Sequence, residues 1–152
     1  PRRINGQCAM ISRQDDENLF LMLSDNLHFW NDPRLLAIPS QPWEFVKIGN
    51  CGSPIETDKG WLLLTHGVKK IKHYCLGAML LDLDDPEKVL GCLKVPLLEP
   101  TGEKREGYVP NVVYSCGAMT HQGRLILPYA LSDTSSTIGI VDLAELLTAL
   151  VP

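Results

Sequence analysis

The apolar residues of this chain come in short runs that are separated by polar, turn-forming segments. Residues 8–12 and 19–23 are two such runs, each as long as a β-strand, and the polar link between them suits a hairpin. Later runs repeat the pattern, at 61–65, 74–81, 112–119, 125–129 and 138–141. Runs of this length, punctuated by 11 prolines and 12 glycines, predict an all-β fold.

A helix is expected at one place, near the C-terminus. Residues 143–150 have a helical repeat of apolar side chains, and Asp142 stands where a carboxylate can cap the first turn. Periodicity alone leaves a sandwich, a barrel and a propeller open as architectures. No linker or low-complexity tract divides the 152 residues, so we expect one structural unit.

The composition is that of a folded domain, with 45% hydrophobic and 21% charged residues. A formal net charge of -4 offers no basic surface for a polyanion, so we expect no nucleic-acid partner. The apolar runs are too short to cross a bilayer as helices, so we expect no membrane span. The 5 cysteines form no C-x-x-C pair and indicate free thiols in a reducing compartment, which predicts a cytoplasmic protein.

Polar side chains gather at three places where predicted strands end. The first holds Glu56 and, after the next apolar run, His66, which precedes a glycine and is free to point into a cleft. The second holds Asn111 and the third holds Asp133. Each also has an ordinary explanation, since a surface charge, a hydrogen-bonded strand end or a turn former produces the same pattern.

Enzymes that act on sugars need carboxylates to protonate a leaving oxygen and aromatic rings as stacking surfaces. Glu56, Asp133, Tyr74, Tyr114 and Trp61 supply both kinds of side chain. This composition is a weak signal by itself, because many soluble domains contain such residues.

Other reaction classes lack their motifs. There is no G-x-S-x-G elbow, no P-loop, no dinucleotide fingerprint and no H-E-x-x-H pattern. His66 and His73 lie on either side of a predicted turn, but their spacing is a poor metal signature, and we expect no metal ion. We also expect no cofactor.

Three ordered motifs resemble glycoside hydrolase family 130, the β-mannoside phosphorylases and related β-mannosidases. They are GNCGSPIETDKGWLLLTHGV at 49–68, YCLGAMLLDLDDP at 74–86 and YVPNVVYSCG at 108–117. Shorter matches at 4–6, 24–30 and 132–134 extend the resemblance over nearly the whole chain.

The resemblance implies a five-bladed β-propeller whose central pocket binds a mannoside, with inversion at the anomeric carbon by phosphate or water. The chain begins with Pro1 and enters an apolar run almost at once, so we expect a cut inside a longer polypeptide. The resemblance then implies that residues 1–152 are the C-terminal portion of a single propeller domain, roughly its last three blades. We expect four-stranded antiparallel sheets arranged radially. The family's catalytic Asp and its Arg-Asn pair for phosphate would precede Pro1.

Several family positions can be placed individually on this sequence. Arg13 matches an arginine that contacts phosphate, and His66, Tyr74, Asn111 and Asp133 match segments at the sugar pocket. We therefore expect them to bind substrate.

Glu56 falls where phosphorylases typically carry a lysine. A carboxylate there would repel phosphate and can instead activate a water, which makes Glu56 a candidate base. We expect Arg13, Glu56, His66, Tyr74 and Asp133 to converge on one face near the propeller axis.

The leading hypothesis is an enzyme for β-mannosides or related oligosaccharides, with hydrolysis preferred over phosphorolysis because of Glu56. Inorganic phosphate would be the co-substrate of a phosphorylase. The alternatives are a non-catalytic sugar-binding propeller and a structural remnant without a ligand. We expect the isolated chain to be inactive and to need the rest of the propeller or another chain as a partner, and a homo-oligomer is a further possibility.

Overall fold

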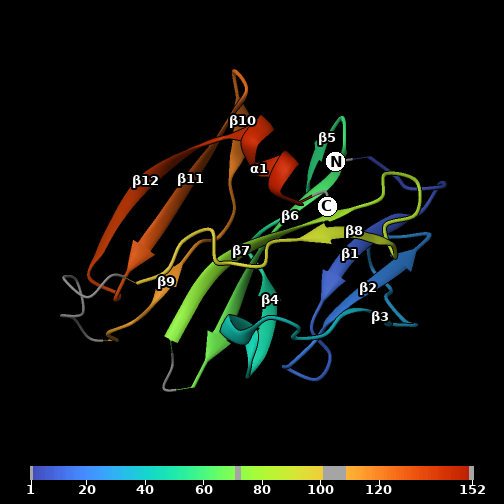
Figure 1. The fold of residues 1–152 in the computed structure, drawn as a ribbon. Coiled ribbons are helices and arrows are strands. Elements are labelled where there is room, and N and C mark those ends of the chain that lie inside the picture. The colour runs from blue at the N-terminus through green and yellow to red at the C-terminus, as the bar shows by residue number, and fades with distance from the viewer. Residues whose placement is uncertain (1, 71–72, 101–108, 151–152) are drawn as a thin grey trace.

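The computed structural model describes residues 2–70, 73–100 and 109–150. These residues form three antiparallel sheets that follow one another along the chain, and one α-helix (Figure 1). The first sheet has the order β1-β2-β3, with strands β1 (Cys8–Ser12), β2 (Leu19–Ser24) and β3 (Arg34–Ala37). The all-β prediction is confirmed.

The middle sheet is the largest, with the order β4-β6-β7-β8 and β5 also paired to β6. Its strands are β4 (Lys47–Asn50), β5 (Ile55–Thr57), β6 (Gly60–Lys69), β7 (His73–Leu81) and β8 (Val89–Cys92). A short 3-10 helix, η1 (Pro42–Glu44), precedes it.

The last sheet has the order β10-β11-β12, with β9 also paired to β11. Its strands are β9 (Val113–Tyr114), β10 (Met119–His121), β11 (Arg124–Leu131) and β12 (Ser135–Asp142).

The middle sheet separates two apolar cores. Alternate residues of a strand point to opposite faces, so Leu63 and Met79 pack on one side with Leu19 and Leu21 of the first sheet. On the other side Leu64 packs in the core that the last sheet and helix α1 (Leu143–Leu150) complete. Burial on both faces explains why β6 and β7 are nearly continuous apolar runs.

The predicted C-terminal helix is confirmed. The N–H of Glu145 donates to the carboxylate of Asp142 at 3.0 Å, which satisfies one of the free amides at the start of the helix. Leu146, Leu147 and Leu150 are buried against the last two sheets.

Two sequence-based expectations need correction. The sheets of the described residues have three, five and four strands rather than four each. The middle sheet has five because β4 and β5 pair with successive parts of β6 and are separated by a turn in which Gly52 has a φ of +78°. The predicted strand 112–119 is broken after β9, where the Ser115 hydroxyl donates to the carbonyl of Pro128 at 2.7 Å.

All five cysteine side chains are free thiols. Within the described ranges, no helix is long enough and apolar enough to cross a membrane.

Candidate functional site

His66 is a buried polar residue on the central strand β6. Only 4% of its surface is exposed, and its ring lies over the backbone of Gly49 on β4, where an added Cβ would be 2.4 Å from Cε1. The imidazole fits there because position 49 has no side chain. Its Nδ1 atom lies 3.7 Å from the thiol sulfur of Cys51.

Two tyrosine rings border this imidazole. The ring of Tyr74 on β7 is stacked with it at a centroid distance of 6.1 Å, and the ring of Tyr114 on β9 is tilted against it at 5.3 Å. Burial raises the pKa of the Tyr114 phenol, which keeps it a hydrogen-bond donor at neutral pH. We call Cys51, His66, Tyr74 and Tyr114 the His66 cluster.

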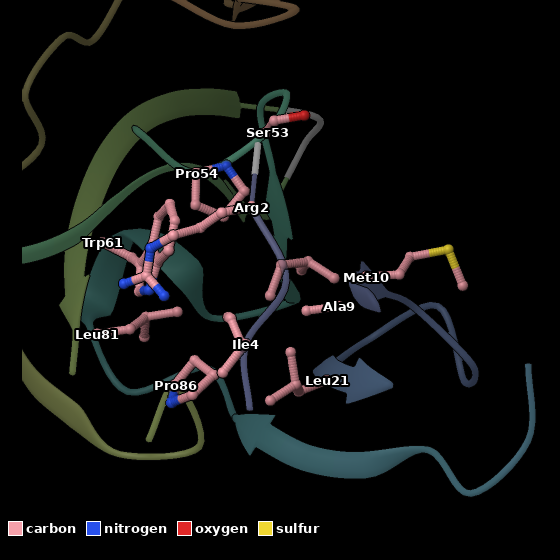
Figure 2. A pocket seen from close by; sticks show the side chains of 11 residues that line it. Arg2, Ile4, Ala9, Met10, Leu21, Ser53, Pro54, Trp61, Leu81 and Pro86 are labelled. Atoms are coloured by element: carbon pink, nitrogen blue, oxygen red, sulfur yellow. The ribbon is translucent and has the colours of Figure 1, made fainter. Parts of the chain in front are cut away.

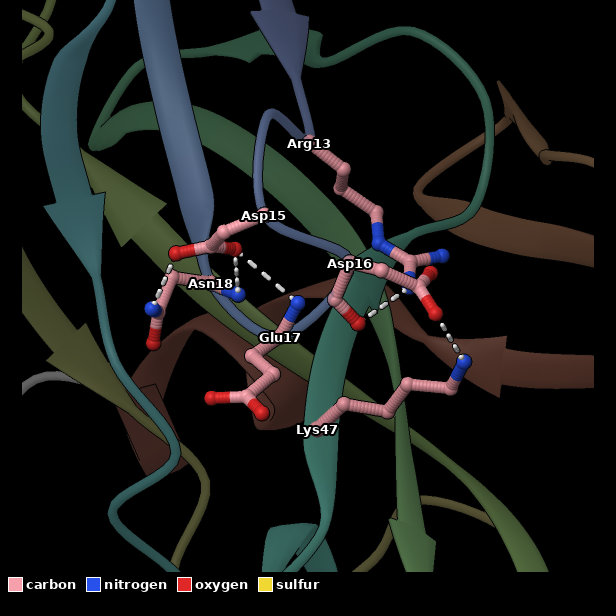
Figure 3. Close-up of polar contacts among 6 residues, drawn as sticks. All are labelled: Arg13, Asp15, Asp16, Glu17, Asn18 and Lys47. Carbon is pink, nitrogen blue, oxygen red and sulfur yellow. Dashed lines mark hydrogen bonds and ion pairs between the residues drawn. The ribbon is translucent and has the colours of Figure 1, made fainter.

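Two cations meet near this cluster on a single carboxylate (Figure 3). The Arg13 guanidinium forms an ion pair with the Asp16 carboxylate and also donates to the backbone carbonyl of Asp16 at 2.8 Å. Lys47 Nζ lies 3.1 Å from Asp16 Oδ2. The loop that carries Arg13 is fixed to β4 because the N–H of Ile48 donates to the carbonyl of Glu17 at 3.0 Å. We call Arg13, Asp16 and Lys47 the cation pair with its bridging carboxylate.

The same charges explain the protonation states of the site. Burial first, and then the positive charges of Arg13 and Lys47, lower the pKa of His66 to about 4. His66 is therefore neutral at neutral pH. The hydrogen bond from Lys47, and then its charge and that of Arg13, lower the pKa of Asp16, so this carboxylate is ionised.

One donor atom and one acceptor atom of the site are buried without a hydrogen-bond partner in the described part of the chain. They are Nε of Arg13 and Oδ1 of Asn111. Asn111 itself is held beside Tyr74, whose N–H donates to its carbonyl at 3.0 Å, and it has a left-handed φ of +69°. A buried polar group without a partner costs stability, so both atoms are candidates for ligand contacts.

Asp133 lies on the neighbouring hairpin. Its turn joins β11 to β12, and the N–H of Ser132 donates to the carbonyl of Val112 at 2.9 Å, which ties the turn to the segment after Asn111. The Asp133 side chain is exposed. The structure thus brings Arg13, His66 and Tyr74 together, with Asn111 next to them and Asp133 on the adjoining turn.

Glu56 does not join them, and this part of the expected convergence is wrong. Glu56 pairs with Trp61, whereas His66 lies five residues further along β6, about 16 Å away at the usual rise of a strand. Figure 1 shows β5 and β4 toward opposite ends of the sheet. The exposed Glu56 carboxylate instead forms an ion pair with Arg2 at 2.8 Å.

A cavity of about 130 Å³ lies near Glu56, between the first and middle sheets (Figure 2). Its lining is mainly apolar, with Ile4, Leu21 and Leu81, and the guanidinium of Arg2 lies over the Trp61 ring at 5.1 Å. The convergent hydrogen-bonding groups that fix a sugar are missing from this lining, so the cavity is a poor candidate site.

A larger groove opens on the other side of the middle sheet. It has a volume of about 780 Å³ and runs between residues 53–55 and the last sheet, with Tyr114 in its lining. Tyr114 therefore contacts His66 and also lines a space large enough for a ligand.

Sequence reasoning missed Lys47 and Asp16. Their signal was weak, because Lys47 begins a four-residue strand and Asp16 lies in a polar loop. Only the pairing of Gly49 with His66 reveals that Lys47, two residues before Gly49 on β4, lies close to the imidazole.

Comparison with known proteins identifies the family. The family model described as beta-1,4-mannooligosaccharide phosphorylase, glycoside hydrolase family 130, matches residues 1–151. The chain belongs to glycoside hydrolase family 130. A 1,2-beta-oligomannan phosphorylase of Thermoanaerobacter sp. (strain X514) is a relative with 39% identity over 149 residues, which cover 96% of this chain and 50% of the relative.

Solved structures of family 130 proteins have the same fold. The beta-1,2-mannobiose phosphorylase from Listeria innocua, in complex with beta-1,2-mannobiose, has a TM-score of 0.88 and 32% identity, covering 99% of this chain and 44% of its own. A second structure, from a study of family 130 hydrolases that target beta-1,2 mannosidic linkages in Candida mannan, has a TM-score of 0.75 and 25% identity, covering 93% and 44%. The chain spans half or less of the length of these relatives.

Proposed function

We propose that the whole protein that contains this chain is a β-mannoside phosphorylase, and that Arg13 and Lys47 bind its phosphate. The observation that carries the proposal is the meeting of these two cations on Asp16 beside the buried His66. Phosphate approaches an anomeric carbon as an anion, so a phosphorylase needs several positive charges at that place.

The charges of this group suit an anion. Asp16 neutralises only one of its two cations, and its side chain is 78% exposed. Because the Asp16 carboxylate is open to solvent, water and salt screen its attraction to the two cations, and a phosphate oxygen can replace it. The buried Nε of Arg13, which lacks a partner among the described residues, gives the incoming anion a further donor.

His66 adds a donor without adding charge. Because its pKa is about 4, the ring is neutral and carries one N–H at neutral pH. Its packing against Tyr74 and Tyr114 fixes the orientation of the ring. A neutral, oriented imidazole is suited to hold a phosphate or a sugar hydroxyl in one position.

The mannoside would contact the two tyrosines of the His66 cluster and the neighbouring Asn111. Tyrosine rings provide stacking surfaces and hydroxyl groups, and Oδ1 of Asn111 is an acceptor for a sugar hydroxyl. Asp133, on the adjoining turn, is a second acceptor. The groove that Tyr114 lines gives the sugar space on the side of this tyrosine away from His66.

Phosphorolysis replaces the preference for hydrolysis that the sequence suggested. That preference rested on Glu56, and a carboxylate about 16 Å from His66 along β6 neither repels phosphate there nor activates a water there. The 1,2-beta-oligomannan phosphorylase and two beta-1,2-mannobiose phosphorylases, which are 33–39% identical to this chain, support the same reaction.

In the proposed reaction a phosphate oxygen forms a bond to C1 of the mannoside as the glycosidic bond breaks. The leaving oxygen takes its proton from the catalytic Asp that the family resemblance places outside this chain. We propose that the remaining half of the protein also completes a five-bladed propeller and covers the exposed apolar side chains of the last sheet, which include Met119, Ile138 and Ile140. The 152 residues alone would then be inactive.

The free thiols favour a cytoplasmic location. The alternative function, a sugar-binding propeller without catalysis, would need the same His66 cluster and would leave the cation pair without a purpose. We therefore prefer the enzyme.

Product analysis of the full-length protein tests the proposal. The protein is incubated with β-1,2- and β-1,4-linked mannobiose, with and without inorganic phosphate, and the products are separated. We expect mannose 1-phosphate that appears only with phosphate. Free mannose at a rate independent of phosphate would show a hydrolase, and sugar binding without any product would show the non-catalytic alternative.

A further inference from the structure

In the described part of the chain, one group of three side chains offers ligand atoms of the kinds that bind transition metals. His73, Cys75 and Glu99 place an imidazole nitrogen, a thiol sulfur and a carboxylate oxygen within 4.8 Å of one another. None of the three belongs to the His66 cluster or to the cation pair.

The backbone fixes this grouping. His73 and Cys75 are alternate residues of β7, so their side chains leave the same face of the sheet. The segment after β8 returns antiparallel to β7, where the N–H of Leu76 donates to the carbonyl of Leu98 at 2.8 Å and these two residues form a bridge. This register places Glu99 directly across from Cys75.

The site is dry on one side and open on the other. Cys75 is fully buried. It is paired with Gly67 on β6, where an added Cβ would lie 2.6 Å from the Trp43 ring. The indole therefore covers the sheet beside the thiol. Glu99 is half exposed, with 53% of its side chain accessible, so an ion can enter from that side.

We propose that His73, Cys75 and Glu99 bind a divalent transition metal of the zinc class. Nitrogen and sulfur ligands select against Mg²⁺ and Ca²⁺, which prefer oxygen, and favour Zn²⁺ or a metal of similar softness. A thiolate and a carboxylate together neutralise a divalent cation, which suits a half-buried position. Three protein ligands leave one tetrahedral position for water or a further ligand.

Metal binding involves a proton exchange at Cys75 and an ion-pair exchange at Glu99. Burial raises the pKa of the Cys75 thiol to about 11, so the metal must displace this proton, which passes to solvent. Lys69, which lies 3.5 Å from the Glu99 carboxylate, must release it. That ion pair is largely exposed and therefore weak, at roughly 0–1 kcal/mol.

The metal site and the proposed phosphate site lie on opposite faces of β7. Tyr74 and Cys75 are successive residues of the strand, so Tyr74 points toward His66 while Cys75 points toward Trp43. The same alternation separates His66, which pairs with Leu76, from His73, which pairs with Lys69. His66 and His73, the pair considered from the sequence, thus cannot share an ion. The proposed ligands, His73 and its neighbours, are a different set.

Cobalt titration of the full-length protein tests the inference, because Co²⁺ bound by a thiolate has a charge-transfer absorption that oxygen and nitrogen ligands do not produce. We expect one equivalent of Co²⁺ to give this absorption in metal-free protein, and Zn²⁺ to abolish it by displacement. Cys75→Ser should remove the absorption, whereas Cys116→Ser, which changes an exposed thiol outside the group, should retain it.

His73→Gln and Glu99→Gln keep the size of the side chains and provide variants that do not alter the buried thiol. Each should weaken Zn²⁺ binding by about ten-fold or more, since even groups that only support metal ligands typically contribute 10- to 100-fold. Absence of the charge-transfer absorption in the wild-type protein would overturn the inference. So would an absorption that Cys75→Ser leaves unchanged, or Zn²⁺ binding that neither His73→Gln nor Glu99→Gln weakens.

Discussion

The imidazole of His66 occupies the space that a side chain at Gly49 would fill, because a Cβ there would lie 2.4 Å from Cε1. The two residues are paired across β4 and β6. Tyr74 and Tyr114 border the other parts of the ring, so the imidazole has little room to move aside.

Gly49→Ala should therefore displace His66 and weaken both the fold and the activity. Overpacking in a tight interior costs about 1–3 kcal/mol, and we expect a lower Tm together with a clear loss of phosphorolysis. Gly139→Ala is the matched control, because the nearest atom to its added Cβ lies at 3.5 Å, an ordinary contact. Equal activity of the Gly49→Ala variant and the control would contradict the proposed role of the packing.

His66 should make stability fall at acid pH. Its pKa in the folded protein is about 4, below the usual 6.5, so the unfolded state binds the proton first. Stability from neutral His66 is thus complete above about pH 6.5 and decreases as the pH falls toward 4, by about 2–3 kcal/mol. Urea unfolding at about pH 7 and about pH 4.5 measures this loss, and His66→Gln should reduce it. An unchanged loss in that variant would show that other groups cause it.

The sequence was sufficient for the elements whose formation is local. The apolar runs and the polar link at 13–18 predicted the β1–β2 hairpin, and Asp142 predicted the start of α1, because strands, turns and caps depend on neighbouring residues. The break after β9 was missed because it depends on a hydrogen bond from Ser115 to Pro128 on another strand.

The site was predicted less well because it depends on register between distant segments. Arg13 came from a family position, and His66 and Tyr74 were indicated by local sequence as well as by family motifs. No local pattern indicates that the loop of Arg13 is bonded to β4 and so meets Lys47. Glu56 was misplaced for the same reason. A motif position does not reveal which end of β6 a neighbouring strand occupies.

Asp142→Ala should destabilise the C-terminal helix. The carboxylate accepts the N–H of Glu145, and loss of such a cap costs about 0.5–2 kcal/mol. Since α1 packs on both the middle and the last sheet, we expect the loss to appear as a lower Tm of the protein. Asp142→Asn, which retains an acceptor oxygen, should recover most of the stability. A variant with alanine that melts like the wild type would contradict this role.

Lys47→Met should weaken the use of phosphate and leave the affinity for the mannoside nearly unchanged. A hydrogen bond to a charged group contributes about 1.5–3 kcal/mol, which corresponds to a rise of about 10- to 100-fold in the KM for phosphate. Lys94→Met, at an exposed position after β8, is the matched control. Steady-state kinetics with phosphate varied at saturating mannoside give the answer, and an unchanged KM would remove Lys47 from the proposed site.

Glu56→Gln separates the two accounts of the reaction. If Glu56 were the base that activates water, the change would abolish the main activity. Its carboxylate instead pairs with Arg2 and lies at the other end of β6 from His66. Both side chains of that pair are more than 40% exposed, so we expect a stability change of at most about 1 kcal/mol. Mannose 1-phosphate should form at a rate within about two-fold of wild type. Loss of a weak, exposed ion pair far from the proposed site should not move the groups that bind phosphate. Rates of product formation with and without phosphate test the predicted activity, and thermal melting tests the predicted stability. A large loss of product in this variant alone would restore Glu56 to the active site and overturn the assignment of phosphate to Arg13 and Lys47.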